Sequence, residues 1–232
     1  DLEKLPHRLS SEAFSYFSRE IYDFLPSATR LFLMQTAVFD VLDTQLLTNF
    51  FTDIDPVAIL KELEKRNLFI QKIDSESQWP VFKYNNLFRD FLKADLFNTL
   101  DKKAYEEMHK RVGKLFWELN AHEEAIRFFI VAGAYSDIAR IIRIKGIDYV
   151  ITGRFSGLAE YIRVLPEEMV KKDPWLVFFR TMTRRIKGGE KNIQAFAKAL
   201  DFFKRVGDHR GILLCTAYLI EAAVFIRKPS QV

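Results

Sequence analysis

The chain has 232 residues, of which 49% are hydrophobic and 28% charged, and its formal net charge is +4. This composition is ordinary for a soluble globular protein, and the length allows one large domain or two modest ones. Glycine and proline are scarce, which excludes an all-β or disordered chain, and 22 phenylalanines favour bulky packing between helices. No apolar run approaches the roughly 18 residues of a membrane span, and no signal peptide is recognisable.

Three helices are expected in the first 51 residues. Ser10 or Ser11 can cap the first helix, and Pro26 can open the second. The inward stripe of the first helix is Phe14, Phe17, Ile21 and Phe24. The inward stripe of the second is Leu31, Met34 and Val38. A short third helix is predicted over residues 45–51.

A fourth helix and a hairpin follow. Asp55 and Pro56 mark the helix start, because aspartate is a favoured N-cap and proline a favoured first residue. Residues 68–73 and 79–84 are predicted to be two short strands joined by a polar loop at residues 74–78. Pro80 has no N–H to donate, so it restricts the second strand to an edge role at that point.

Another helix, starting near Leu87, completes the pattern of a winged helix. Its inward stripe is Leu87, Phe88, Phe91, Leu92 and Leu96. We place this winged-helix domain within residues 1–98. Charge supports the boundary, because residues 1–98 hold 11 Lys and Arg against 15 Asp and Glu, whereas residues 99–232 hold 24 against 16.

From about residue 100 onward only helices are predicted. They cover residues 105–119, 123–132, 136–144, 158–164, 174–186, 193–206 and 212–226. The connectors are short and carry glycine or proline at Gly133, Gly146, Gly153, Pro166, Gly188, Gly189 and Gly207. Short connectors make consecutive helices antiparallel neighbours, so residues 99–232 are predicted to form a tetratricopeptide-like array of helical hairpins. The fold class is therefore mainly all-α.

No catalytic or metal site is expected from the sequence. The four histidines are scattered without zinc-ligand spacing, and Gly188 to Asn192 lacks the upstream glycine of a Walker phosphate loop. The single cysteine, Cys215, lies in an apolar run, which favours a buried thiol over a nucleophile. One cysteine also fits a reducing compartment, so we expect a cytoplasmic location.

Two charged regions are candidates for binding. Arg180, Arg184 and Lys187 are spaced to share one helix face, so they can bind an anion or an acidic partner, although a solvated outer face is the simpler alternative. Direct DNA binding by the winged helix is disfavoured, because phosphate neutralisation requires a basic surface and residues 1–98 are net acidic. A role in packing between other domains is favoured instead.

Several segments, in order along the chain, resemble a known family. Residues 32–40 (FLMQTAVFD), 60–70 (LKELEKRNLFI) and 82–92 (FKYNNLFRDFL) resemble the winged-helix segment of large ATP-dependent LuxR-family regulators. These are the MalT-type members of the STAND class of signalling ATPases. Residues 123–139 and 153–176 are similar to the helical hairpins that follow it.

The resemblance implies a longer parent chain, as does a sequence that starts at Asp1 and ends with a helix pattern. The implied neighbours are an ATPase domain before these residues, further sensor array after them, and a C-terminal helix-turn-helix that reads DNA. ATP and ADP are implied for the parent, and no cofactor for these residues. The implied partners are the neighbouring domains and an inducer or inhibitory protein, with no membrane.

The resemblance also implies a nucleotide contact. Related proteins usually carry a histidine, which reaches the nucleotide phosphate, where this chain has Asn85 and Asn86. An asparagine can donate a hydrogen bond but carries no charge, so Lys83 and Arg89 are further candidates. The alternative is that both asparagines simply cap the helix.

The sequence thus predicts a non-catalytic regulatory piece. In it, a helical array senses an inducer or partner and the winged helix couples this to the nucleotide state of the parent. The alternative is a helical scaffold that binds a protein or peptide constitutively.

Overall fold

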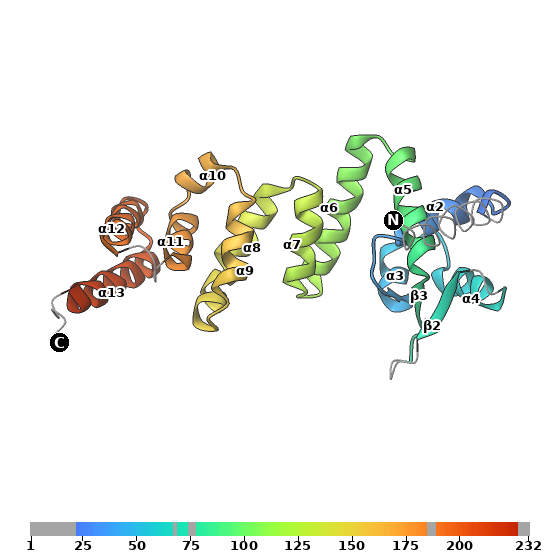
Figure 1. Cartoon of the computed structure of the whole chain (residues 1–232), viewed down its shortest axis with the longest axis horizontal. Coiled ribbons are helices and arrows are strands. Elements are labelled where there is room, and N and C mark those ends of the chain that lie inside the picture. Colours follow the sequence, from blue (N-terminus) through green and yellow to red (C-terminus); the bar gives the residue numbers. More distant parts are fainter. Residues whose placement is uncertain (1–21, 67–68, 74–77, 185–188, 227–232) are drawn as a thin grey trace, which may run out of the picture. The chain divides into compact units, whose positions relative to one another are not determined.

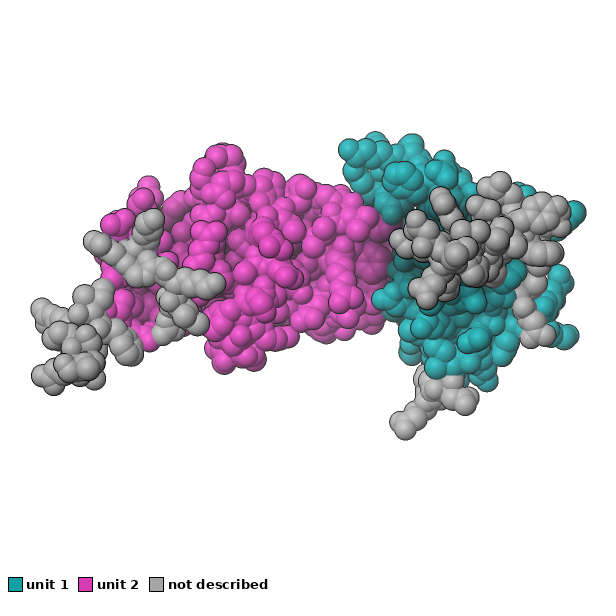
Figure 2. Space-filling view, in the orientation of Figure 1, with its two compact units in different colours: residues 1–108 teal, residues 109–232 magenta. Residues whose placement is uncertain are grey.

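A computed structural model describes residues 22–66, 69–73, 78–184 and 189–226 (Figure 1). The chain divides into two compact units, residues 1–108 (unit 1) and 109–232 (unit 2), which Figure 2 colours separately. The division between the units falls inside helix α6 (Lys102–Glu118). Most of the predicted first helix, with Ser10, Ser11, Phe14, Phe17 and Ile21, lies outside the described residues. The prediction that Phe24 faces inward was wrong, because its side chain is 90% exposed. None of the described helices is long and apolar enough to cross a membrane.

Unit 1 is a winged helix built from short helices and a small sheet. Its described elements are α2 (Ser27–Thr36), β1 (Leu42–Asp43), α3 (Thr44–Phe50), α4 (Pro56–Lys65), β2 (Ile70–Ile73), β3 (Val81–Tyr84) and α5 (Asn86–Thr99). Carboxylates fix two helix starts. Asp43 accepts a hydrogen bond from the Gln45 N–H at 2.8 Å, and Asp55 accepts one from the Ala58 N–H at 3.0 Å.

The three strands pair antiparallel in the order β1–β3–β2. The prediction of an edge role for the second strand was therefore wrong, because β3 is the central strand. Pro80 immediately precedes β3, so its missing N–H removes no bond from the ladder. Its carbonyl accepts a hydrogen bond from the Thr44 hydroxyl at 2.7 Å. Strand β1 was not predicted, because a strand of two residues is too short to show alternation of polar and apolar side chains.

Both the helices and the strands of unit 1 contribute buried side chains to its core. Its fully buried large side chains include Phe32, Leu33, Leu42, Leu47, Leu60, Phe82, Leu92 and Leu96. The predicted stripe of the second helix was wrong at two positions. Leu31 is 41% exposed, and Val38 lies beyond the end of α2. Helix α5 buries Phe88 as predicted, while Leu87 is 42% exposed.

Unit 2 is an array of helical hairpins in which successive helices reverse direction (Figure 1). After α6 come α7 (His122–Val131), α8 (Tyr135–Ile151), α9 (Phe155–Arg163), α10 (Glu167–Lys172), α11 (Pro174–Thr183), α12 (Gly189–Val206) and α13 (His209–Ile226). Gly133, Gly153 and Gly207 have positive φ and end helices, as connector glycines should. The mainly all-α prediction is thus confirmed.

Gly146 is a correction, because it lies inside α8 and does not connect two helices. It is buried, and an added Cβ would lie 2.4 Å from the Phe179 ring. The same arrangement recurs between Gly113 and the Phe129 ring, and between Gly211 and the Phe203 ring. Glycine at these positions lets a phenylalanine ring pack directly against a helix backbone, which gives the abundant phenylalanines a structural role.

Candidate functional site

The first candidate site is the junction between β3 and α5, where three of the predicted nucleotide contacts lie together. Lys83, Asn85 and Asn86 are all exposed within four consecutive residues. The Asn85 side-chain oxygen accepts a hydrogen bond from the Leu87 N–H at 2.9 Å, so this residue is the N-cap of α5. Asn86 is the first residue of the helix.

Capping engages only one end of the Asn85 side chain. The carbonyl oxygen is occupied, while its NH2 group makes no hydrogen bond to a described residue and is exposed to solvent. Capping and donation to an anion are therefore compatible in one residue, since asparagine has an acceptor and two donors. The backbone N–H of Asn85 is fixed separately by the Phe69 carbonyl at 2.7 Å.

Arg89, the fourth candidate, is committed to contacts inside unit 1. Its Nε donates to the Ala37 carbonyl at 3.0 Å, and its guanidinium forms an ion pair with Asp40. These bonds tie α5 to the segment that follows α2, and they pair the arginine charge with a carboxylate. One helical turn further on, burial lowers the pKa of Lys93, and the Arg89 charge lowers it further.

The second candidate was the basic face of residues 180–187. Arg180 donates a hydrogen bond to a Glu167 carboxylate oxygen at 2.8 Å, so it is already paired. Arg184 is exposed and lies at the C-cap, because α11 ends at Thr183 and not at residue 186 as predicted. Lys187 lies outside the described residues. The structure therefore places only Arg180 and Arg184 of this predicted set.

Arg180 instead belongs to a groove that the sequence did not reveal. A hollow of about 550 Å³ lies between α11 and α12, with a contribution from α10. Its cations are Lys171, Arg180, Lys198 and Arg205, and Asp201 is its lining carboxylate. These residues come from three helices, so only packing brings them together. No sequence spacing could have predicted this group.

The remaining groups with a potential for chemistry are metal-ligand clusters and Cys215. Among the described residues, no cluster of three potential metal ligands occurs. Cys215 is fully buried as predicted, and burial raises the pKa of its thiol to about 12. The thiolate is therefore unpopulated at neutral pH, which removes its nucleophilic form.

The fold and these sites define a winged-helix module followed by a helical-hairpin array. Comparison with known proteins shows which proteins this chain is similar to. Residues 18–104 match the family model described as the MalT winged helix domain. The helices from α7 onward lie outside this match.

Curated relatives match across more of the chain. The "HTH-type transcriptional regulator MalT" of Vibrio cholerae serotype O1 is 25% identical over 175 residues, which cover 75% of this chain and 19% of that protein. Regulators of the same name from Vibrio campbellii and Vibrio parahaemolyticus are each 24% identical over 165 residues. The chain thus spans about a fifth of the length of the relatives it matches.

The MalT-type resemblance predicted from the sequence is confirmed by these matches. Residues 18–104 of unit 1 are thus similar to a MalT winged helix, and the longer matches are to proteins named as transcriptional regulators.

Proposed function

We propose that this chain is the coupling segment of a nucleotide-gated, MalT-type transcriptional regulator. In this proposal the winged helix packs on an ATPase domain of the same parent chain and stabilises its ADP-bound resting state. The helical array, which we propose to be tetratricopeptide-like, binds an inducer or an inhibitory protein better in one state than in the other. Only such a difference in affinity shifts the balance between states. The parent would work in the cytoplasm.

The observation that carries this proposal is the MalT winged-helix match over residues 18–104, with the helical array continuing directly from it. The exposed Lys83, Asn85 and Asn86 supply a local reason. They present an ammonium group and amide donors at the start of α5, where the helix dipole also favours an anion. Arg89 contributes indirectly, by holding α5 in place through Ala37 and Asp40.

The test uses the parent chain that contains these residues. Asn85→Ser keeps a capping oxygen but removes the amide donor, and Asn86→Ala and Lys83→Ala remove the other two groups. We expect the triple variant to release ADP faster and to activate transcription at lower inducer concentration. Lys72→Ala, which removes an exposed lysine of neighbouring β2, is the matched control. Unchanged ADP release in the triple variant would refute the nucleotide contact.

The groove of unit 2 favours a second candidate, a constitutive scaffold. A hollow lined by side chains from three helices can bind a partner without any nucleotide. Partner affinity separates the two functions. The gated regulator predicts different affinities in ATP and in ADP, whereas the scaffold predicts equal affinities. Upstream Walker residues and a downstream helix-turn-helix in the parent reading frame are the first features to look for.

A further inference from the structure

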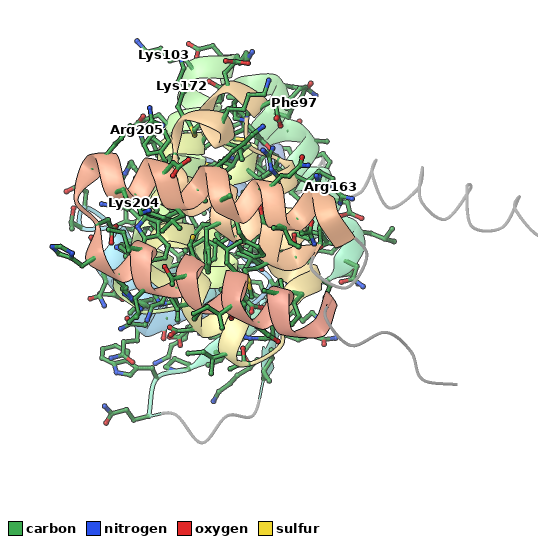
Figure 3. The ribbon with its side chains drawn as sticks, turned by 90° about the vertical axis from the view of Figure 1, so that its left-hand side faces the viewer. Phe97, Lys103, Arg163, Lys172, Lys204 and Arg205 are labelled. Atoms are coloured by element: carbon green, nitrogen blue, oxygen red, sulfur yellow. The ribbon has the colours of Figure 1, made fainter. Side chains whose placement is uncertain are left out.

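The groove between α11 and α12 is lined by both charged and apolar side chains. Val177, Ala195 and Ala199 contribute apolar surface, and Lys198 and Arg205 stand on the α12 side. Figure 3 shows Arg205 on the side of α12 that is nearer to α10 in this view, where Lys172 is also labelled. Groups of this kind suit a ligand that combines negative charge with apolar side chains.

The cations on the α10–α11 side already bind carboxylate within the chain. Glu167 accepts a hydrogen bond from Arg180 at 2.8 Å and lies 4.0 Å from the Lys171 ammonium. The α12 side differs. Lys198 and Arg205 form no ion pair with any described residue, although the Arg205 guanidinium lies 5.0 Å from the centre of the Phe202 ring. These two cations are therefore available to an incoming carboxylate.

The spacing of the two cations restricts what can bind both. Lys198 and Arg205 are two helical turns apart on one face, which corresponds to about 10.5 Å along the axis at 1.5 Å per residue. Asp201 lies between them and repels negative charge at the centre. The separation favours a ligand with two negative groups over a single phosphate. An extended peptide rises about 3.3 Å per residue and presents every second side chain to one face. Carboxylates four residues apart therefore lie about 13 Å apart on that face, within reach of the two long side chains, with one apolar side chain between them.

We propose that this groove binds an acidic segment of polypeptide, with carboxylates at Lys198 and Arg205 and an apolar side chain between them against Val177, Ala195 and Ala199. The proposal rests on the sensing role proposed above and gives its partner a chemical class. It differs from the predicted basic face, because Arg184 does not line the groove and the α12 cations do.

The test measures binding of a fluorescein-labelled twelve-residue peptide with glutamate at every fourth position, leucine two residues after each glutamate, and alanine or serine elsewhere. Fluorescence anisotropy with the 232-residue chain gives the dissociation constant. The same peptide with glutamine for glutamate is the uncharged probe. Lys198→Gln/Arg205→Gln is the test variant. Lys204→Gln is the matched control, since Lys204 is exposed on the same helix and does not line the groove. Circular dichroism checks that all variants remain folded.

We expect saturable binding of the acidic peptide, no binding of the glutamine peptide, and about tenfold weaker binding to the double variant, as for the loss of two exposed charge pairs. Lys204→Gln should bind like the wild type. Equal losses in both variants would indicate unspecific attraction and overturn the proposal, as would the absence of binding. Tripolyphosphate is titrated in parallel. If it binds through Lys198 and Arg205 while the peptide does not, the groove is a small-polyanion site and the proposal is wrong. None of these failures affects the ADP-release test of the gated regulator.

Discussion

The contacts that stabilise unit 1 differ in kind from the contacts that stabilise unit 2. In unit 1 polar groups far apart in the sequence meet. The hydroxyls of Thr36 and Tyr84 lie 2.7 Å apart, and Arg89 reaches the Ala37 carbonyl. In unit 2 the main contacts join helices that are near neighbours in the sequence, such as α7 with α8 and α12 with α13. Buried aliphatic and aromatic side chains fill these interfaces, and side-chain bonds such as the one from Trp175 Nε1 to Asp208 lie at partly buried or exposed positions.

This difference indicates how each unit can transmit a change. Stability in a stacked array is close to a sum of local terms, so a disturbance at one interface weakens its neighbours first. A small core closed by long-range bonds responds as a whole, because each bond joins distant segments. A disturbance in the array is thus expected to remain local, whereas unit 1 is expected to respond as a whole.

The largest expected effect comes from the aromatic core of the array. Phe178 is fully buried and contacts the rings of Trp175, Phe179, Phe196 and Tyr218. Phe178→Ala should cost about 3–5 kcal/mol, and hydrogen exchange should accelerate in α11 to α13 well before unit 1. Leu213→Ala is the control, because this side chain is 71% exposed and its loss should change stability by less than about 0.5 kcal/mol. If hydrogen exchange accelerated equally in both units, the array would not respond locally, and the difference between the two units would be contradicted.

A smaller effect tests the glycine–ring contacts. Gly146→Ala would place a Cβ 2.4 Å from the buried Phe179 ring, so we expect a loss of about 1–3 kcal/mol from overpacking. Gly157→Ala, in α9, meets nothing within 4 Å and should be stabilising by about 0.5–1 kcal/mol. Urea denaturation of both variants measures the difference. Equal effects would show that the close approach at Gly146 has no energetic role.

Local signals in the sequence were sufficient for most helices. Asp55-Pro56 marks the start of α4 by N-capping, and Asp173 caps α11 in the same way, accepting from the Trp175 N–H at 2.9 Å. Elements too short to show a period, β1 and the six-residue α10, were missed. Gly146 was misplaced because glycine marks a helix end in sequence, although here it admits a ring.

The sites were less accessible to prediction. Asn85 and Asn86 could be found because they lie together in sequence, and the capping role foreseen for both is made by the Asn85 side chain. The groove cations could not be found, because Lys171 and Arg205 are distant in sequence and become neighbours only when the helices stack. The same holds for Arg89, whose pairing with Asp40 depends on the fold of unit 1.

Removing one hydroxyl group tests how much a long-range hydrogen bond stabilises unit 1. Tyr84 is buried, and burial holds the pKa of its hydroxyl well above the usual value, so it remains a neutral hydrogen-bonding group. Tyr84→Phe should cost about 0.5–1.5 kcal/mol through the lost bond to Thr36. A cycle with Thr36→Val isolates the coupling between the two hydroxyls. Additive effects of the two substitutions would mean that this bond does not hold α2 to the sheet.

The smallest expected effect is a pH dependence confined to the array. Burial lowers the pKa of His122, and the nearby Lys145 charge lowers it further. Its Nδ1 atom is buried and has no hydrogen-bond partner among the described residues. As the pH falls below about 6.5, His122 is protonated in the unfolded chain but remains neutral in the folded array. The free energy of unfolding is therefore highest above that pH and decreases as the pH drops below it. Thermal denaturation between pH 5 and 8 should show this loss in the wild type and in His209→Gln, an exposed control, but not in His122→Gln. If the loss of stability at low pH persists in His122→Gln, the acid sensitivity comes from groups other than His122.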